Sequence, residues 1–229
     1  AYIVLTKNNV PMLSDDRQWL VTGRFASIYP LIIENKKHFK SVVAVANDKR
    51  QAVLKTVLIN KDDAAFFPIR VTPKKMAHFA NNMMGSPYGW GGLYGYRDCS
   101  STLQDLFSPF GLWLPRNSRE QAKSGQVIHL EGVNAAQKEQ ILKDQAIPFF
   151  SLLKSPGHIM LYIGQKEREF YVFHTVWGVP TRNVFSTDGR AVIGKTVITS
   201  LNLGRGYINV PKVLIDKVQT LTLLDYGES

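Results

Sequence analysis

Residues 85–107 read GSPYGWGGLYGYRDCSSTLQDLF, and this stretch decides the fold of the second part of the chain. Its first half is too rich in glycine for a regular helix or strand. The following run from Ser100 to Phe107 is compatible with a short helix, which Pro109 and Gly111 would end. Cys99 therefore stands where a glycine-rich loop meets the start of a helix.

Cys99 is the only cysteine among the 229 residues, so the chain cannot form an internal disulfide. A helix N-terminus carries unpaired N–H groups and a partial positive charge. In such a place the pKa of a thiol can fall from about 8.5 to about 3.5–7.5, and the same N–H groups can hold an oxyanion. The pattern predicts a nucleophilic thiolate, and the alternative is a buried structural cysteine.

The first 60 residues have the texture of short strands separated by turn-forming clusters. Five strands in this length predict a small β-barrel of the SH3-like or OB-like kind, residues 1–60, followed by a linker at 61–72. The five runs are Tyr2–Leu5, Trp19–Thr22, Ile28–Ile33, Phe39–Ala46 and Val53–Ile59.

The texture changes at Thr72, which can cap a helix whose first residue is Pro73. Helical apolar spacing predicts a helix to Met84, and Asn134 can cap a second helix ending near Lys143. Strands are expected for the remainder. They are a hairpin of Ile159–Ile163 with Phe170–Val176, then Ala191–Thr199 and Val218–Leu224. Residues 73–229 are thus predicted to form an α+β domain.

Two histidines lie on that hairpin. With its turn centred near Lys166, His158 and His174 would be directly opposed and would share one face of the sheet. The pair can be read as metal ligands, but no third ligand is fixed by spacing. It can also be read as a general base with its orienter, as in cysteine peptidases, or one histidine can simply satisfy a strand end.

Four segments carry a family resemblance. They are PYGWGG at 87–92, DCSS at 98–101, GLWLPRNS at 111–118 and GHIMLYIG at 157–164. Together they resemble the NlpC-type cell-wall cysteine endopeptidases over Thr72–Ser229. The N-terminal strands look like the bacterial SH3-like domain that often precedes this catalytic domain.

The resemblance implies a papain-like catalytic domain, in which the helix bearing the nucleophile packs on an antiparallel sheet. It implies hydrolysis of peptidoglycan stem peptides at the γ-D-glutamyl bond to the diamino acid, with no cofactor and no metal. The roles implied are Cys99 as nucleophile, His158 as general base and acid, and His174 as its orienter. Tyr88 matches a tyrosine that assists the oxyanion hole.

The resemblance also implies a set of substrate-binding residues. Asp98 and Ser100 flank the nucleophile, and Asp98 would pair with the free amine of an N-terminal L-alanine or would cap the helix. Trp90, Arg116 and Ser118 would line the pocket, with Arg116 suited to a carboxylate. One departure is residues 145–150, which lack the Gly-Asp pair that the family usually has before the histidine strand.

Composition narrows the possible partners. A net charge of +10 favours an anionic partner such as peptidoglycan or another envelope polymer. Nucleic acid is not expected, because the basic residues are scattered and the aromatic ones gather beside Cys99. No apolar run approaches the roughly 18 residues of a membrane helix.

The sequence leaves alternatives for the cellular location and for the function of the protein. The chain starts at Ala1, so either a leader has been removed or the sequence is a trimmed piece. We expect a monomer in the periplasm or secreted to the cell envelope, with a cytoplasmic recycling role as the alternative. The other functions to be tested are an acyltransferase on the same core and a non-catalytic cell-wall-binding protein.

Overall fold

The computed structural model describes residues 1–182, 188–206, 209–210 and 212–225. The chain divides into two compact units. The first comprises Ala1–Thr72 with Asp105–Trp113, and the second comprises Pro73–Gln104 with Leu114–Ser229. The predicted end of the catalytic region, residues 226–229, lies outside the described residues.

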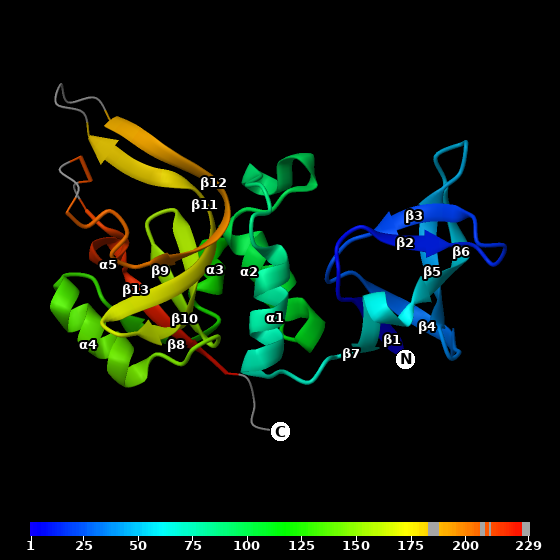
Figure 1. Cartoon of the computed structure of the whole chain (residues 1–229), viewed down its shortest axis with the longest axis horizontal. Helices are drawn as coiled ribbons and strands as arrows, with labels where there is room; N and C mark the ends of the chain where they lie inside the picture. The colour runs from blue at the N-terminus through cyan, green and yellow to red at the C-terminus, as the bar shows by residue number, and fades with distance from the viewer. Residues whose placement is uncertain (183–187, 207–208, 211, 226–229) are drawn as a thin grey trace. The chain divides into compact units, whose positions relative to one another are not determined.

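The first unit contains a seven-stranded antiparallel sheet in the order β3-β2-β6-β5-β4-β1-β7 (Figure 1). Alternate residues on its strands point inward, and Ile3, Leu5, Met12, Val57 and Ile59 are fully buried in one apolar cluster. The elements are β1 (Tyr2–Leu5), β2 (Val10–Leu13), β3 (Trp19–Gly23), β4 (Ile28–Glu34), β5 (His38–Ala46), β6 (Ala52–Asn60), η1 (Lys61–Asp63) and β7 (Ala64–Phe67).

Two of these strands depart from the sequence-based expectation of five. β2 contains Pro11, which argues against a strand interior, yet Pro11 is exposed and the main-chain pairing of β2 with β6 is confined to Leu13 and Leu58. β7 lies inside the predicted linker 61–72 and pairs with β1 over its whole length. The linker is therefore shorter than expected, because residues 61–67 add a turn and an edge strand to the sheet. That this sheet is an SH3-like barrel stays a prediction.

The second unit is a mixed α/β structure on a six-stranded antiparallel sheet, in the order β12-β11-β10-β9-β13-β8. Figure 1 shows α1 and α2 on one side of this sheet and α4 on the other. The strands are β8 (Gly125–His129), β9 (Ser151–Ser155), β10 (His158–Lys166), β11 (Glu169–Arg182), β12 (Asp188–Ser200) and β13 (Thr220–Leu224). The helices that follow residue 72 are α1 (Pro73–Met83), η2 (Trp90–Gly95), α2 (Cys99–Phe107), η3 (Ser108–Phe110), α3 (Ser118–Gln121), α4 (Ala135–Gln145) and α5 (Leu214–Lys217). Of these, η3 and the last three residues of α2 belong to the first unit.

The predicted helices form where their caps and apolar spacing place them. α1 buries Met76, Phe79, Ala80 and Met83, one stripe of a helix. α4 begins with a capping box, in which the Asn134 side chain accepts the Gln137 N–H at 3.0 Å. No helix among the described residues is long and apolar enough to cross a membrane.

The hairpin of β10 and β11 differs in register from the expectation. Leu161 pairs with Phe173, and a bulge after Tyr162 shifts the pairs beyond it. The strands close at Lys166 and Glu169, with Glu167 in the left-handed region at φ 57°. The turn is centred beyond Lys166, so the expectation that His158 and His174 are directly opposed is wrong. They meet along the diagonal, which long side chains still span.

Candidate active site

The glycine-rich loop before α2 is held in a shape that needs its glycines. Gly91 and Gly92 have φ angles of 65° and 91°, in the region that residues with a Cβ rarely adopt. At Gly89 a Cβ would lie 2.5 Å from the Leu93 carbonyl oxygen, so the chain passes too closely for a side chain. This folding brings the Gly91 N–H to the Asp98 carboxylate at 3.2 Å.

Asp98 is the N-cap of α2. Its Oδ1 accepts the Ser101 N–H at 2.9 Å, and the Ser101 hydroxyl accepts the Asp98 N–H at 2.9 Å. A cap of this kind stabilises a helix by about 1 kcal/mol. The capping role foreseen for Asp98 is therefore confirmed, and it explains why α2 begins at Cys99.

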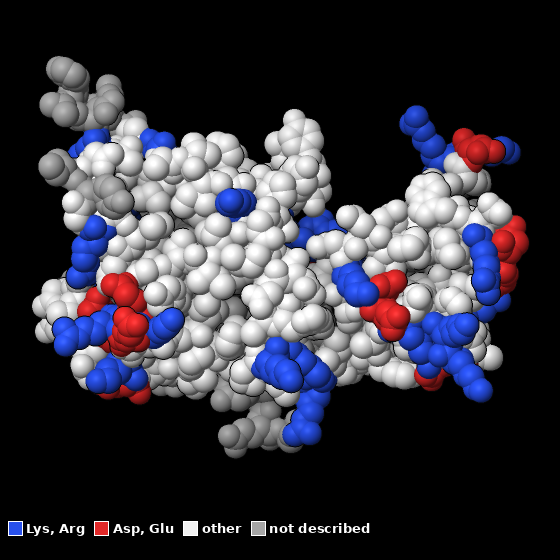
Figure 2. All heavy atoms as spheres, in the orientation of Figure 1, with Lys and Arg blue, Asp and Glu red and all other residues white. Residues whose placement is uncertain are grey.

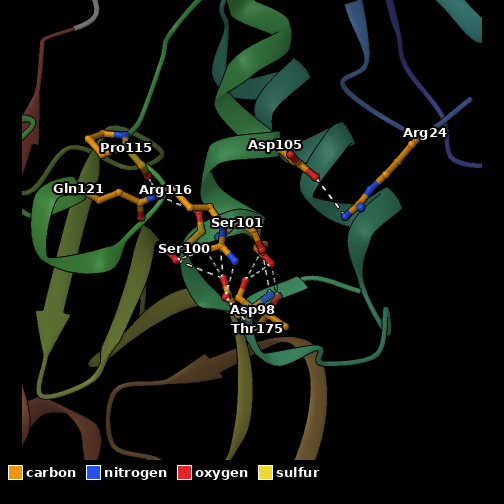
Figure 3. A network of polar contacts seen from close by, with 11 residues as sticks. Arg24, Asp98, Ser100, Ser101, Asp105, Pro115, Arg116, Gln121 and Thr175 are labelled. Atoms are coloured by element: carbon orange, nitrogen blue, oxygen red, sulfur yellow. Dashed lines mark hydrogen bonds and ion pairs between the residues drawn. The ribbon is translucent and has the colours of Figure 1, made fainter. Parts of the chain in front are cut away.

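The Asp98 carboxylate is also bound by a guanidinium. Arg116 donates from Nη1 to Oδ1 at 3.1 Å and from Nη2 to Oδ2 at 2.8 Å, and its Nη1 lies 3.0 Å from the Ser100 hydroxyl (Figure 3). Burial would raise the pKa of the Asp98 carboxyl, but the Arg116 and Ser101 hydrogen bonds outweigh it and the pKa lies below its usual range. Arg116 is thus already paired with a carboxylate of the protein, whereas the sequence suggested that its guanidinium binds a carboxylate of the substrate. Its side chain remains 46% exposed, so one edge can still meet a ligand.

Two sets of buried side chains fix this network in place. The Gln121 amide donates to the carbonyl oxygens of Ser100 and Pro115, each at 2.8 Å, and so ties α2 to the segment that carries Arg116 (Figure 3). The Thr102 hydroxyl bonds the Asp98 carbonyl at 2.8 Å and the Thr175 hydroxyl on β11. The first turn of α2 is therefore anchored to the sheet.

The two histidines form a hydrogen-bonded chain. His158 Nε2 lies 2.8 Å from His174 Nδ1, and His174 Nε2 lies 3.0 Å from the Thr199 hydroxyl on β12. His174 is 1% exposed. Burial lowers the pKa of His158 to about 4 and that of His174 well below its usual value, so both rings are neutral at pH 7. Thr199 was not foreseen, because only the pairing of β11 with β12 brings it to His174.

The Cys99 side chain lies beside the start of β10. It is 8% exposed, and burial raises the pKa of its thiol more than the N–H groups of Ile159 and Ser100 lower it. The prediction that the helix N-terminus lowers this pKa is therefore wrong in direction. At pH 7 the thiol and the His158 imidazole are both neutral, and His158 directly precedes the Ile159 that contacts the sulfur.

Alkylation of Cys99 by iodoacetamide should report this protonation state. A raised thiol pKa leaves less thiolate at each pH, so the rate should rise about tenfold per pH unit between pH 6 and pH 8. Cys99 is the only cysteine, so no other thiol contributes. The His158→Ala variant should show the same slope. A rate that is flat over this range in the wild type and steep in the variant would instead reveal a thiolate–imidazolium pair.

Tyr88 stands close to the nucleophile. Its N–H donates to the Gly194 carbonyl at 2.9 Å and its ring lies 5.9 Å from that of Trp177. Burial raises the pKa of the Tyr88 phenol, and the nearby Cys99 and Asp98 raise it further. The hydroxyl therefore stays protonated and can donate a hydrogen bond.

The remaining candidate residues are Trp90 and Ser118. Trp90 is 82% exposed on η2. Ser118 is the first residue of α3, which Asn117 caps, and it lines a separate cavity that also contains Lys154. No cluster of three or more His, Cys, Asp or Glu side chains suited to a metal ion occurs in the described parts of the chain.

Two solved structures of known proteins are similar to this chain. The chain is 30% identical to an NlpC/P60 endopeptidase from Photobacterium damselae subsp. piscicida, with a TM-score of 0.82, covering 97% of this chain and 53% of that one. An NlpC/P60 family protein from Bacillus cereus ATCC 10987 shares the fold at 14% identity, with a TM-score of 0.66, covering 96% of this chain and 62% of that one.

A curated relative matches in sequence. It is the gamma-D-glutamyl-L-lysine dipeptidyl-peptidase of Bacillus subtilis (strain 168), 26% identical over 147 residues, which are 61% of this chain and 43% of the relative. The chain thus spans about half the length of these proteins.

A family model also matches part of the chain. The NlpC/P60 model matches residues 85–179, which run from the glycine-rich loop through Cys99 to His158 and His174. The chain contains an NlpC/P60 family domain.

Proposed function

We propose that this protein is a cysteine peptidase that hydrolyses peptidoglycan stem peptides at the γ-D-glutamyl bond to the diamino acid. The observation that supports it most is the hydrogen-bonded pair of neutral histidines, 2.8 Å apart, at the strand that contacts Cys99. The family domain and the γ-D-glutamyl-L-lysine specificity named for the curated relative favour the same bond.

In the proposed mechanism, His158 acts as a base during the attack itself. Its Nε2–H is donated to His174 Nδ1, which leaves Nδ1 of His158 free to take the Cys99 proton. As that proton moves, the sulfur bonds to the γ-carbonyl carbon. The tetrahedral oxyanion would accept hydrogen bonds from the Tyr88 hydroxyl and a main-chain N–H at the start of α2.

The second half of the reaction releases the products. His158 gives the proton to the departing amine as the C–N bond breaks, and a thioester remains on Cys99. His158 then removes a proton from water, whose oxygen adds to the thioester carbonyl. The sulfur leaves and regains a proton, and the glutamyl fragment departs with a free γ-carboxylate. No step calls for a cofactor.

On the acyl side of the bond, we propose roles that follow the hydrogen bonds around Asp98. Its carboxylate is occupied by Arg116, Ser100, Ser101 and Gly91, so we assign it mainly to positioning these groups. The exposed edge of Arg116 and the Ser100 hydroxyl are suited to the α-carboxylate of D-glutamate. Trp90 would cover the terminal alanine.

Defined peptides test this proposal. L-Ala-γ-D-Glu-L-Lys should be cleaved to L-Ala-D-Glu and lysine, which mass spectrometry identifies. Acetylation of the alanine amine tests Asp98: slower cleavage would show that its carboxylate also receives the amine, and an unchanged rate would leave it as a positioning residue. A product joined to an added amine would indicate the acyltransferase, and unchanged peptide under all conditions would leave a wall-binding protein. Figure 2 shows Lys and Arg scattered over the visible face, so charge marks no single polymer-binding track on that face.

A further inference from the structure

A cavity of about 740 Å³ lies beside the proposed catalytic pair and has no role in the mechanism above. Its walls come from α3, β8, the end of β9 and the start of β13, and Gly157 closes it next to His158. The volume falls within the roughly 300–1,000 Å³ typical of ligand sites. It is therefore large enough for an amino acid or a short peptide.

Its wall carries unneutralised positive charge. Lys123 is paired with Glu120 at 3.0 Å, and the other charged residues of the lining are Arg119, Lys154 and Glu131. The Lys154 ammonium donates a hydrogen bond to the Ser155 carbonyl. Neither Arg119 nor Lys154 has an ion-pair partner among the described residues. Lys154 is within electrostatic reach of Arg119, Cys99 and His158, and burial together with Arg119 lowers the pKa of its ammonium group. A carboxylate between the two cations would relieve this repulsion.

The wall also offers an unused hydroxyl. Thr220 pairs with Lys154 across β9 and β13. Its Oγ1 is buried and has no hydrogen-bond partner among the described residues. Buried hydroxyls are usually satisfied, and this one would reach a ligand in the cavity after a small rotation of its side chain.

We propose that this cavity binds the amine-side fragment of the substrate and that Lys154, with Arg119 and Thr220, receives its carboxylate. The inference rests on the proposed function. In that mechanism His158 protonates the departing amine, so the amine-side fragment lies on the His158 side of the bond. Gly157 and Lys154 in its lining put the cavity on that same side. Lys154 is thus a specificity residue for a free carboxylate.

Two substrates that differ only in charge test the proposal. We expect L-Ala-γ-D-Glu-L-Lys to be cleaved with about tenfold higher kcat/KM than its C-terminal carboxamide, mainly through KM, because a charge-assisted contact is lost in the amide. The Lys154→Gln variant should bring this ratio close to one. The ratio is informative even if kcat changes, since both substrates undergo the same chemistry. Lys123→Gln, on the same wall but in an ion pair with Glu120, should keep the ratio.

Binding measurements test the role of the cavity independently of the proposed peptidase activity. Free L-lysine should bind the wild type more tightly than L-lysinamide by calorimetry, and Lys154→Gln should abolish the difference, whether or not any peptide is cleaved. Cleavage with equal rates for both substrates, or equal binding of both ligands, would overturn the role of the cavity while leaving the hydrolase intact. Selective lysine binding without any cleavage would support the cavity and reject the proposed activity.

Discussion

The Cys99→Ala variant should lose cleavage of γ-D-glutamyl peptides by at least about 10⁴-fold in kcat, down to the background of the assay. Removing the sulfur removes the bond-forming atom, and the histidine pair has no other nucleophile to activate. Substrate affinity should change little, since the contacts proposed for the peptide come from Arg116, Ser100 and the cavity near Lys154. Product formation followed by mass spectrometry, with binding measured by calorimetry, gives both numbers.

The variant should stay folded. Cys99 is the first residue of α2, where alanine is a good helix former, and the Asp98 cap and the Thr102 anchor do not involve its side chain. A melting temperature within a few degrees of the wild type is therefore expected. Wild-type turnover by a folded Cys99→Ala protein would contradict the mechanism, whereas loss of fold would mean that the thiol is a core residue.

The His174→Ala variant should lower kcat by roughly 10³-fold while leaving KM within a few-fold. In the proposed mechanism His174 accepts a hydrogen bond from the His158 Nε2–H, which keeps His158 in the tautomer with a free Nδ1, and without it the ring can rotate or tautomerise. Some activity remains because the nucleophile and the oxyanion donors are intact. The measurement is kcat and KM across pH 5–9, together with the melting temperature.

Variants of Thr199 can show whether it orients His174 through its hydroxyl or only packs against it. In the tautomer that the mechanism requires, His174 Nε2–H is donated to the Thr199 hydroxyl 3.0 Å away. Thr199→Val, which has the same shape but no oxygen, should therefore lower kcat by about tenfold. Thr199→Ser keeps the hydroxyl and should restore most of the rate. Equal losses in valine and serine variants would show that Thr199 acts only through packing.

Much of this site could be predicted from local sequence. The loop, the helix that starts beside Asp98 and the strand that starts at His158 are each defined by neighbouring residues. The meeting of the two histidines was foreseen, but with the wrong register, because neither the turn at Glu167 nor the bulge after Tyr162 has a strong sequence signal.

Other features depend on residues brought together from distant segments. The sign of the Cys99 pKa shift depends on burial, which packing of the whole unit decides. The pairing of Arg116 with Asp98 uses two chemically ordinary side chains, 18 positions apart. Lys154 lies on β9, a five-residue strand that was not predicted, and Thr199 reaches His174 through a third strand.

The most direct test of the central claim is cleavage of L-Ala-γ-D-Glu-L-Lys in water enriched in oxygen-18. We predict one heavy oxygen in the γ-carboxylate of the L-Ala-D-Glu product with the wild type, and no product with Cys99→Ala. Heavy oxygen in a different fragment, or labelled product from the Cys99→Ala protein, would contradict the account.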